Sequence, residues 1–481
     1  MNHIGQGRPL SSDFVLEALT RSISVDQVEL VLDQVQGRRR RRWRKIPLCA
    51  VVWLVVGIGL FSDQDISSIW RQVAGTLKTL WNSLEGNKPP VKSALSKARQ
   101  RLGARAMRLL YKLTATTAAQ AQGPRSAQLS PQGYPEVGGA FYRGKRLIGM
   151  DGQKLSVPDT PANARAFGRC QTRRGSEPVA AGYPQVLLMR LVELGTHLSL
   201  EALIKPACYS EQKVARFLLE KTPVNSLLLW DSGFYSYTLL KQAMERGVQV
   251  LGRLPSTPIF QPIRRLSDDS ILAYVYPDPW ARRRGDSSKA ILARIIRYTI
   301  DDPHRPGAGE IHRLVTTLLD EMTYPAKELV QLYHLRWEFE IANDELTSHQ
   351  LARPVDLRSL KPAGVVQELY GVLLAHNAIR RVMCESAQRQ KIDPRTLSFT
   401  HAVRVIKATI PLMRAAKTEL LPGLYKAMVA QVGQGKLPRR DNRINPRVIK
   451  VKMSKWKKKR PEHLKPPQPQ KTFQESIVML K

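Results

Sequence analysis

Three acidic residues stand where a carboxylate could bind a metal ion: Asp151, Asp231 and Glu340. Asp151 and Asp231 each follow an apolar run typical of a β-strand, and glycine follows each within two residues. In α/β sheets ligands usually bind at strand ends, which favours a metal site. Asp-Gly and Asp-Ser-Gly are also ordinary turn sequences. Taken alone, each aspartate is more readily interpreted as a turn residue.

The third acidic residue shares its segment with other polar side chains. Residues 323–352 predict one long helix with Thr323 as its N-cap. Tyr333, Arg336 and Glu340 have the spacing i, i+3 and i+7, so they would share one face of that helix. A tyrosine, an arginine and a carboxylate on one stripe suit a site that holds metal and phosphate. The alternative is an amphipathic helix with a surface Arg–Glu pair.

The elements that would position these residues begin at Phe141. The pattern predicts three strands, a helix, a strand, a helix and a last strand, which is the ribonuclease-H-like arrangement. The predicted elements are two strands around a tight turn at Asp151–Gly152 within 146–157, a hairpin over 185–205 that turns at Gly195, a helix over 209–221, a strand over 225–236 that ends in Asp231, a helix over 237–246 and a strand over 248–254.

Residues 1–125 predict a helical domain. Its longest apolar run, Ile46–Phe61, has 16 residues and falls short of the roughly 20 that span a membrane, so a buried helix is expected. After a double proline, a short basic helix that stops at Gly103 is predicted to contact DNA. Its basic residues are Lys92, Lys97, Arg99 and Arg101. The alternative is an exposed basic helix face.

Charge indicates the class of partner. Of 481 residues, 76 are Lys or Arg and 40 are Asp or Glu, giving a net charge of +36 that favours a polyanion such as nucleic acid. Five consecutive arginines occupy 38–42, and residues 431–481 carry 15 basic and three acidic side chains. Four scattered cysteines fit a reducing cytosol. We expect a helical domain at 1–125, a linker at 126–140, a catalytic domain at 141–430 and a basic, partly disordered tail at 431–481.

At this point the sequence resembles the DDE transposases of bacterial insertion sequences, specifically the insertion-element-four group. The signature of that group is Tyr-x2-Arg-x3-Glu-x6-Lys, which Tyr333, Arg336 and Glu340 match, whereas Thr347 stands at the lysine position. The blocks around Asp151 (149–168) and Asp231, and the segments 46–70 and 367–383, are also similar to the group. The resemblance covers most of residues 10–455.

The resemblance implies a multidomain α/β protein: a helical N-terminal DNA-binding domain, a ribonuclease-H-like catalytic core with a β-rich insertion at about 255–322, and a basic tail. It implies that Asp151, Asp231 and Glu340 are both the catalytic residues and the ligands of Mg²⁺, with Mn²⁺ as a substitute. Arg336 would clamp a phosphate near the metal ions, and Tyr333 would hydrogen-bond a nearby phosphate oxygen, so both are expected to bind DNA. Arg353 is a candidate replacement for the missing lysine.

The implied activity is DNA transposition. The enzyme would bind the terminal inverted repeats of its element as double-stranded DNA, cleave at the element ends and join 3′ hydroxyls to target DNA. A dimer is expected in the DNA complex, with no membrane association, and the expected location is the bacterial cytoplasm at the nucleoid. Two alternatives stay open: an inactive DNA-binding relic, indicated by Thr347, and a metal-dependent nuclease without strand transfer.

The remaining polar residues are expected to have lesser roles. The histidines at 197, 334, 349 and 376 are interpreted as structural or surface residues because they form no metal-like cluster. Glu338, Asp344 and Glu345 are interpreted as solvent-facing or supporting. A basic loop at 281–286 could lie against DNA, and Trp280 beside it could stack on a base or simply pack.

Overall fold

The computed structural model describes residues 23–36, 46–77, 89–121, 140–169, 171–174, 177–180, 182–351, 357–438, 448–449, 457–464 and 468–480. The chain forms two compact units, each built from separated stretches of sequence. Unit 1 contains residues 1–125, 152–210 and 338–436, and unit 2 contains residues 126–151, 211–337 and 437–481. The arginine run at 38–42, Arg353 and nearly all of the predicted linker lie outside the described residues. The four-part domain division stays a prediction.

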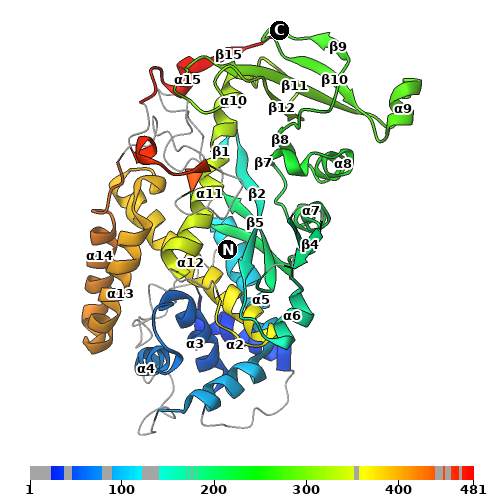
Figure 1. Ribbon diagram of the computed structural model, residues 1–481. Coiled ribbons are helices and arrows are strands. Elements are labelled where there is room, and N and C mark those ends of the chain that lie inside the picture. The colour runs from blue at the N-terminus through cyan, green and yellow to red at the C-terminus, as the bar shows by residue number, and fades with distance from the viewer. Residues whose placement is uncertain are drawn as a thin grey trace, which may run out of the picture. The chain divides into compact units, whose positions relative to one another are not determined.

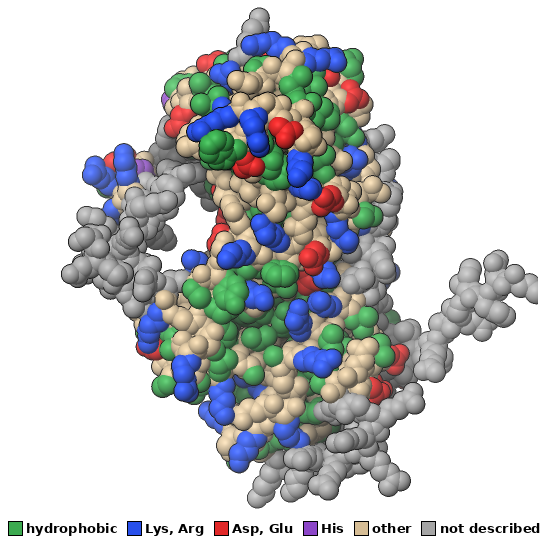
Figure 2. All heavy atoms as spheres, turned by 90° about the vertical axis from the view of Figure 1, so that its right-hand side faces the viewer, with side chains coloured by type: hydrophobic (Ala, Val, Ile, Leu, Met, Phe, Trp, Pro, Cys, Tyr) green, Lys and Arg blue, Asp and Glu red, His purple; other side chains and the backbone are tan. Residues whose placement is uncertain are grey.

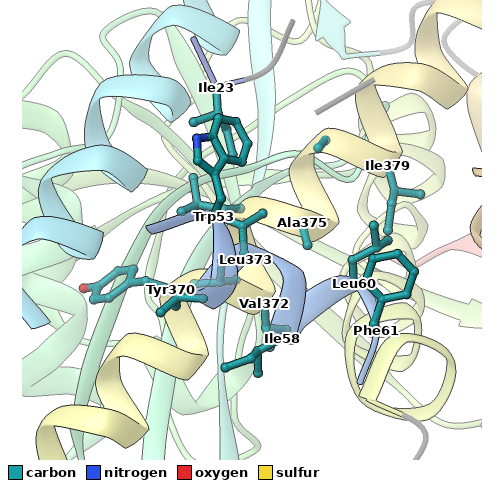
Figure 3. Close-up of a cluster of buried hydrophobic side chains, with 14 of the residues drawn as sticks. Ile23, Trp53, Ile58, Leu60, Phe61, Tyr370, Val372, Leu373, Ala375 and Ile379 are labelled. Carbon is teal, nitrogen blue, oxygen red and sulfur yellow. The ribbon is translucent and has the colours of Figure 1, made fainter. Parts of the chain in front are cut away.

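A fully apolar helix forms the centre of unit 1. In α3 (Leu48–Leu60) every residue after Leu48 is buried, as expected for a helix that is apolar on all sides. Its side chains pack against α12 (Pro362–Gln390), where Trp53 and Ile58 meet Tyr370 and Leu373 (Figure 3). The predicted buried helix is therefore confirmed. Among the described residues, no helix combines the length and apolar character needed to cross a membrane.

Two glycines allow the backbones of α3 and α12 to touch. A Cβ atom on Gly59 would lie 2.6 Å from the carbonyl oxygen of Gly371, and one on Gly371 would lie 2.3 Å from that of Val55. Both distances are shorter than any carbon–oxygen contact that a folded protein tolerates. Any larger residue at either position would push the two helices apart and open the core of unit 1.

The other helices of unit 1 pack on this pair or on its neighbours (Figure 1). They are α2 (Val25–Gln36), α4 (Ile66–Leu77), α5 (Lys92–Ala121), α6 (Pro161–Phe167), α13 (Phe399–Ala415) and α14 (Leu421–Val432). Gly103 was predicted to end a short helix, and its backbone is indeed non-helical, with φ 70° and ψ 172°; a second helical stretch follows directly, so α5 consists of two helices joined at a kink. Leu102 before the kink and Met107 and Leu110 after it are buried in the same core, so both helical stretches pack within unit 1.

Unit 2 is built on a mixed sheet with the order β2-β7-β8-β12-β11-β10-β9. The strands β2, β7 and β8 are parallel, and each pair from β8 to β9 is antiparallel. The bounds are β2 (Lys145–Ser156), β7 (Ser226–Trp230), β8 (Gln249–Arg253), β9 (Pro262–Arg265), β10 (Ile271–Val275), β11 (Ile291–Ile300) and β12 (His312–Thr316), with β1 (Phe141–Tyr142) paired to β2.

Most of the strand and helix predictions for this region are confirmed. α7 (Glu211–Leu219) precedes β7, and α8 (Tyr237–Glu245) forms the crossover between the parallel strands β7 and β8. In unit 1, β5 (Gln185–Glu193) and β6 (Ser199–Pro206) form the predicted hairpin around Gly195. The strands β9 to β12 all fall within or at the edges of the expected β-rich insertion, with the short helix α9 (Pro279–Arg284) between β10 and β11.

The turn predicted at Asp151–Gly152 is wrong. β2 runs without interruption through both residues and is twelve residues long. The Asp-Gly pair favours a turn only where no partner strand competes for its backbone groups, and here the apolar run that precedes Asp151 pairs with β7. Asp151 therefore lies inside a strand, and its side chain direction is fixed by the pleat of the sheet.

The single long helix predicted at 323–352 is also wrong, because the segment is broken. It consists of α10 (Ala326–His334), α11 (Trp337–Asp344) and a π-helical segment, Glu345–Leu351. Between the first two helices, the backbone N–H groups of Leu335 and Arg336 donate to carbonyls three residues back, each at 3.0 Å. Such tight turns end a helix. The common face assumed for the Tyr-Arg-Glu signature is therefore interrupted, and Pro325 rather than Thr323 occupies the N-cap of α10.

The C-terminal end of the predicted basic tail is folded onto unit 2. β15 (Ile477–Met479) pairs with β11, and the short helix α15 (Phe473–Ser476) precedes it. The Phe473 and Ile477 side chains are buried, and the ring of Phe473 stacks on that of His334 with centroids 4.3 Å apart. The buried side chains of Phe473 and Ile477, together with the three paired residues of β15, hold this end of the chain on unit 2.

Candidate active site

Asp151 and Asp231 occupy equivalent positions on neighbouring parallel strands. The register of β2 and β7 pairs Gly149 with Leu229, and two further residues along both strands bring Asp151 opposite Asp231. Asp231 directly follows β7, yet its backbone is still extended, with φ −83° and ψ 168°. Because neighbouring strands are about 4.8 Å apart, equivalent side chains of a parallel pair project together. Unit 2 thus brings together two of the three predicted acidic residues.

Packing beneath Asp231 fixes its position. The preceding residue, Trp230, is fully buried, and its indole lies against Gly252 of β8 so closely that a Cβ atom there would fall 2.0 Å from the indole nitrogen. Asp231 itself caps the short helical turn that follows, because its Oδ1 accepts a hydrogen bond of 2.7 Å from the Ser232 backbone N–H. One carboxylate oxygen is therefore used to orient the group.

The end of α10 carries the two polar residues of the signature that belong to unit 2. The Tyr333 hydroxyl donates to the carbonyl oxygen of Trp230 at 3.2 Å, beside Asp231. Burial raises the pKa of Tyr333, Arg336 opposes that shift and Asp231 adds to it, so the phenol stays protonated at neutral pH. The Nη1 atom of Arg336 lies 3.9 Å from Oδ2 of Asp151. Within unit 2, Tyr333 and Arg336 therefore lie beside the two aspartates at the same end of the parallel strands.

An ion pair between a buried arginine and a partly exposed aspartate fixes the start of α10. Arg294 of β11 is fully buried and pairs with Asp268, and Oδ2 of Asp268 also accepts a 2.8 Å hydrogen bond from the Ala326 backbone N–H at the first turn of α10. The guanidinium of Arg294 donates to the Tyr324 carbonyl at 2.7 Å as well. Sequence reasoning missed this support because the partners come from distant elements and neither residue belongs to a recognisable motif.

Glu340 lies on α11, in unit 1, and its side chain is half-buried. The preceding residue, Phe339, is buried, and the guanidinium of Arg190 from β5 lies 5.5 Å from its ring centroid. Arg190 also donates to Oδ1 of Asn343 at 2.5 Å, one helical turn after Glu340. The hairpin β5–β6 therefore holds the helix on both sides of this carboxylate.

Thr347, at the lysine position of the signature, lies in the π-helical segment. Its hydroxyl donates to the Asn343 carbonyl at 2.9 Å, and the amide of Gln153 lies 3.5 Å from the hydroxyl oxygen. The side chain is half-buried. Thr347 thus satisfies the backbone where the helix widens, a role that a lysine side chain could not take.

Comparison with known proteins identifies the family. The model "Insertion element 4 transposase N-terminal" matches residues 14–112, and the model "Transposase DDE domain" matches residues 142–378. The chain is 31% identical to transposase InsG of insertion sequence element IS4 from Escherichia coli K12, over 94% of this chain and 97% of the relative. The chain belongs to the IS4 family of DDE transposases.

Two further similarities are weaker. The putative transposase InsZ of Escherichia coli K12 is 28% identical over 45% of this transposase and 63% of the relative. The piggyBac transposase in a synaptic complex with hairpin DNA superimposes with a TM-score of 0.41 and 10% identity, over 86% of this chain and 85% of that chain.

DDE transposases use divalent metal ions, and the donor chemistry of this transposase fits such ions. Asp151, Asp231 and Glu340 are half-buried carboxylates, and oxygen ligands are those that Mg²⁺ and Mn²⁺ prefer. Asp151 and Asp231 side by side would repel one another, and a cation relieves that repulsion. Within the described residues, no three His, Cys, Asp or Glu side chains form a group that could hold a metal ion.

The basic residues predicted at the start of α5 differ in their surroundings. Lys92, Lys97 and Arg101 are exposed, although Lys92 lies 3.9 Å from Asp65 and Arg101 donates to the Ile46 carbonyl at 3.3 Å. Arg99 points inward and donates to the Ser359 hydroxyl at 3.0 Å and the Gly364 carbonyl at 3.1 Å. Burial lowers the pKa of Arg99. Its guanidinium therefore ties α5 to the start of α12 within the transposase.

Basic side chains are spread widely over the surface of this transposase. On the face seen in Figure 2, Lys and Arg side chains are scattered with fewer Asp and Glu side chains among them. In α9, Arg282, Arg283 and Arg284 are exposed, and Trp280 is 68% exposed with the guanidinium of Arg283 5.4 Å from its ring centroid. From the sequence alone, Trp280 could either stack on a base or simply pack. Its exposure shows that the side chain does not pack into a core.

Proposed function

We propose that this transposase binds the terminal inverted repeats of its own element, cleaves the DNA at the element ends and joins the 3′ hydroxyls to target DNA. Asp151, Asp231 and Glu340 are proposed to hold two divalent cations, Mg²⁺ or Mn²⁺, in a ribonuclease-H-like core. The observation that carries the proposal is the common register of Asp151 and Asp231 with Arg336 beside them. Bound cations would activate the attacking oxygen and stabilise the leaving oxygen.

The side chains around the two aspartates support phosphoryl transfer. The guanidinium of Arg336 carries a fixed charge and a planar set of donors that match a phosphate. Its Nη1 atom lies 3.9 Å from Oδ2 of Asp151, so a phosphate bound at the proposed metal site would lie beside the guanidinium. Tyr333 would not titrate, because burial holds its pKa high, so it orients the end of β7 through the Trp230 carbonyl.

DNA binding is proposed to use two exposed basic surfaces. The first comprises Lys92, Lys97 and Arg101 at the start of α5, with Arg99 kept for packing. The second is α9, where three consecutive arginines and an exposed tryptophan offer phosphate contacts and a stacking surface. Because two element ends must be joined, the active form is proposed to be a dimer on DNA, and the protein is proposed to associate with the bacterial nucleoid.

The proposal is tested by supplying the full chain with DNA that carries the inverted repeats flanking its coding region. Mg²⁺-dependent cleavage at the repeat ends followed by strand-transfer products is the expected result. Cleavage without joining would favour a nuclease. Binding without cleavage in either Mg²⁺ or Mn²⁺ would favour the inactive relic, for which Thr347 in place of lysine is the sequence feature.

A further inference from the structure

A buried histidine joins two glutamates on either side of Glu340. His197 lies in the turn between β5 and β6, is 1% exposed and has a φ of 59°. Its Nδ1 is 3.1 Å from Oε1 of Glu345, and its Nε2 is 2.9 Å from Oε2 of Glu338. Positive φ is uncommon for a residue other than glycine and is retained where the surrounding structure requires it. The backbone is therefore held in a costly conformation that directs this ring at two carboxylates.

The two glutamates bracket the proposed metal ligand. Glu338 lies in the first turn of α11, two residues before Glu340, and Glu345 opens the π-helical segment five residues after it. A separation of seven residues is two turns of helix, so both carboxylates reach the same side. The imidazole has a nitrogen on each side of its ring, so this one side chain contacts both carboxylates at once.

The inner glutamate is firmly anchored. Glu345 is 5% exposed, and its carboxylate also contacts the Arg380 guanidinium and the His376 ring, each at 3.2 Å. Burial alone would raise the pKa of Glu345, but Arg380 and His197 outweigh it and hold the pKa well below its ordinary value. Arg380 also donates to the Thr196 carbonyl at 2.7 Å, which holds the turn that carries His197.

These contacts suit a device that orients a side chain better than one that merely fills a core. Burying charged groups costs free energy. Apolar residues of similar size would usually stabilise the fold at least equally. Here His197 contacts Glu338 at the start of α11 and Glu345 just after its end. Arg190 adds a third contact with the helix by donating to Asn343. Glu340 is the half-buried carboxylate between these attachments.

We propose that His197 is a positioning residue for Glu340: by bridging Glu338 and Glu345 it fixes the rotation of α11, and with it the direction of the carboxylate that binds the metal. This inference rests on the proposed function, since it gives Glu340 the role of a metal ligand. Glu338 acts as an acceptor for His197 and is not itself a ligand.

The test compares four single variants of the full chain on terminal-repeat DNA: His197→Gln, Glu338→Ala, Glu338→Gln and, as a matched control, His349→Gln. His349 lies on the same π-helical segment as Glu345, is exposed and contacts Asp344 at 3.2 Å. Affinity for Mn²⁺ is measured by electron paramagnetic resonance of the free ion, end cleavage is measured separately, and thermal unfolding reports whether each variant folds.

His197→Gln and Glu338→Ala are expected to weaken Mn²⁺ binding and end cleavage by about 10- to 100-fold, the usual cost of losing a group that orients a metal ligand. DNA affinity is expected to stay unchanged. Glu338→Gln is expected to behave like the wild type, because its amide oxygen still accepts a hydrogen bond from His197. The double variant His197→Gln/Glu338→Ala is expected to be no worse than either single variant.

Several results would overturn the inference. Wild-type Mn²⁺ affinity in both Glu338→Ala and His197→Gln would mean that the network only stabilises the fold. Equal losses in Glu338→Gln and Glu338→Ala would mean that Glu338 acts through its charge. If His197→Gln fails to fold, the two Glu338 variants decide, since that side chain is 18% exposed. Glu340→Ala distinguishes a failure of the positioning role of His197 from a failure of the proposed function. Normal Mn²⁺ binding and cleavage in that variant would refute the proposed function itself.

Discussion

The register of the parallel strands β2 and β7 brings Asp151 opposite Asp231, the residue that directly follows β7, although 80 residues of sequence separate them. The pairing that aligns them is made by the apolar residues before each aspartate, so the core of unit 2 sets the position of its two acidic groups. A one-residue shift in this register would send the two side chains to opposite faces of the sheet. The pair is therefore a direct product of strand packing.

Asp231→Ala is expected to abolish end cleavage while leaving affinity for terminal-repeat DNA unchanged, because it removes a proposed metal ligand and no basic group. Gel-shift and nicking assays on one preparation measure both. Asp393→Ala is a matched control, since Asp393 also caps a three-residue helical turn, by accepting from the Arg395 backbone N–H at 2.8 Å. Removing the cap in either variant is expected to lower the free energy of unfolding by about 1 kcal/mol. Retained nicking in Asp231→Ala would exclude a ligand role.

Arg336→Ala and Arg336→Lys are both expected to lower the end-cleavage rate by about 100-fold, as is typical when a preorganised donor to the reacting group is removed. A lysine cannot reproduce the planar fork beside Asp151. Single-turnover cleavage on prebound DNA provides the measurement. Arg143→Lys is the control, because Arg143 pairs with Glu328 at 3.0 Å, at the other end of α10. Normal cleavage by Arg336→Lys would show that charge alone is sufficient.

Local sequence pattern was enough to predict the apolar strands that precede Asp151 and Asp231 and the helices α7 and α8 on either side of β7, whereas α6 was not predicted. Apolar runs indicate which segments are buried, and turn residues indicate where those segments end. These two signals are sufficient to predict such strands and helices. The break at Leu335–Arg336 could not be predicted in this way, since neither glycine nor proline marks it. The sequence there has good helical periodicity, and the break is visible only in the backbone hydrogen bonds of Leu335 and Arg336, which return to carbonyls three residues back.

Long-range polar contacts were equally invisible in the sequence. His197 and Glu345 are 148 residues apart, and neither belongs to a motif. Glu338 and Glu345 were interpreted as solvent-facing or supporting because their angular positions on a straight helix differ from that of Glu340. The supporting interpretation of Glu345 agrees with its burial, but its partners appear only when the hairpin β5–β6 is folded.

Thr347→Lys is expected to preserve or raise strand transfer. The side chain is half-buried, so a lysine can extend its ammonium group to solvent or to a DNA phosphate, while the backbone carbonyl of Asn343 loses one hydrogen bond. That loss is expected to cost about 1 kcal/mol of stability. Integration products are counted for both proteins at equal DNA occupancy. A clear loss of strand transfer would show that the site has adapted to threonine.

Replacing the three arginines of α9 with alanine is expected to weaken binding to terminal-repeat DNA and to reduce its salt dependence. Removing one arginine–phosphate pair lowers the slope of log K against log salt concentration by about 0.9. Fluorescence anisotropy at several salt concentrations measures the slope. A matched triple variant replaces exposed basic residues on and just after α7, in the same unit: Lys213, Arg216 and Lys221. Equal slopes for both triple variants would mean that α9 does not contact DNA.

Stability is expected to fall as the pH drops from about 6.5 to about 4, because burial lowers the pKa of His376 to about 4 from an ordinary 6.5, with Glu345 opposing the shift. Between these values the unfolded chain binds a proton that the folded chain excludes, so acid favours unfolding by up to about 1.4 kcal/mol per pH unit. Urea unfolding across this range should give a shallower pH dependence for His376→Gln than for the wild type or for His349→Gln. A His376→Gln curve parallel to that of the wild type would mean that this ring takes up no extra proton on unfolding.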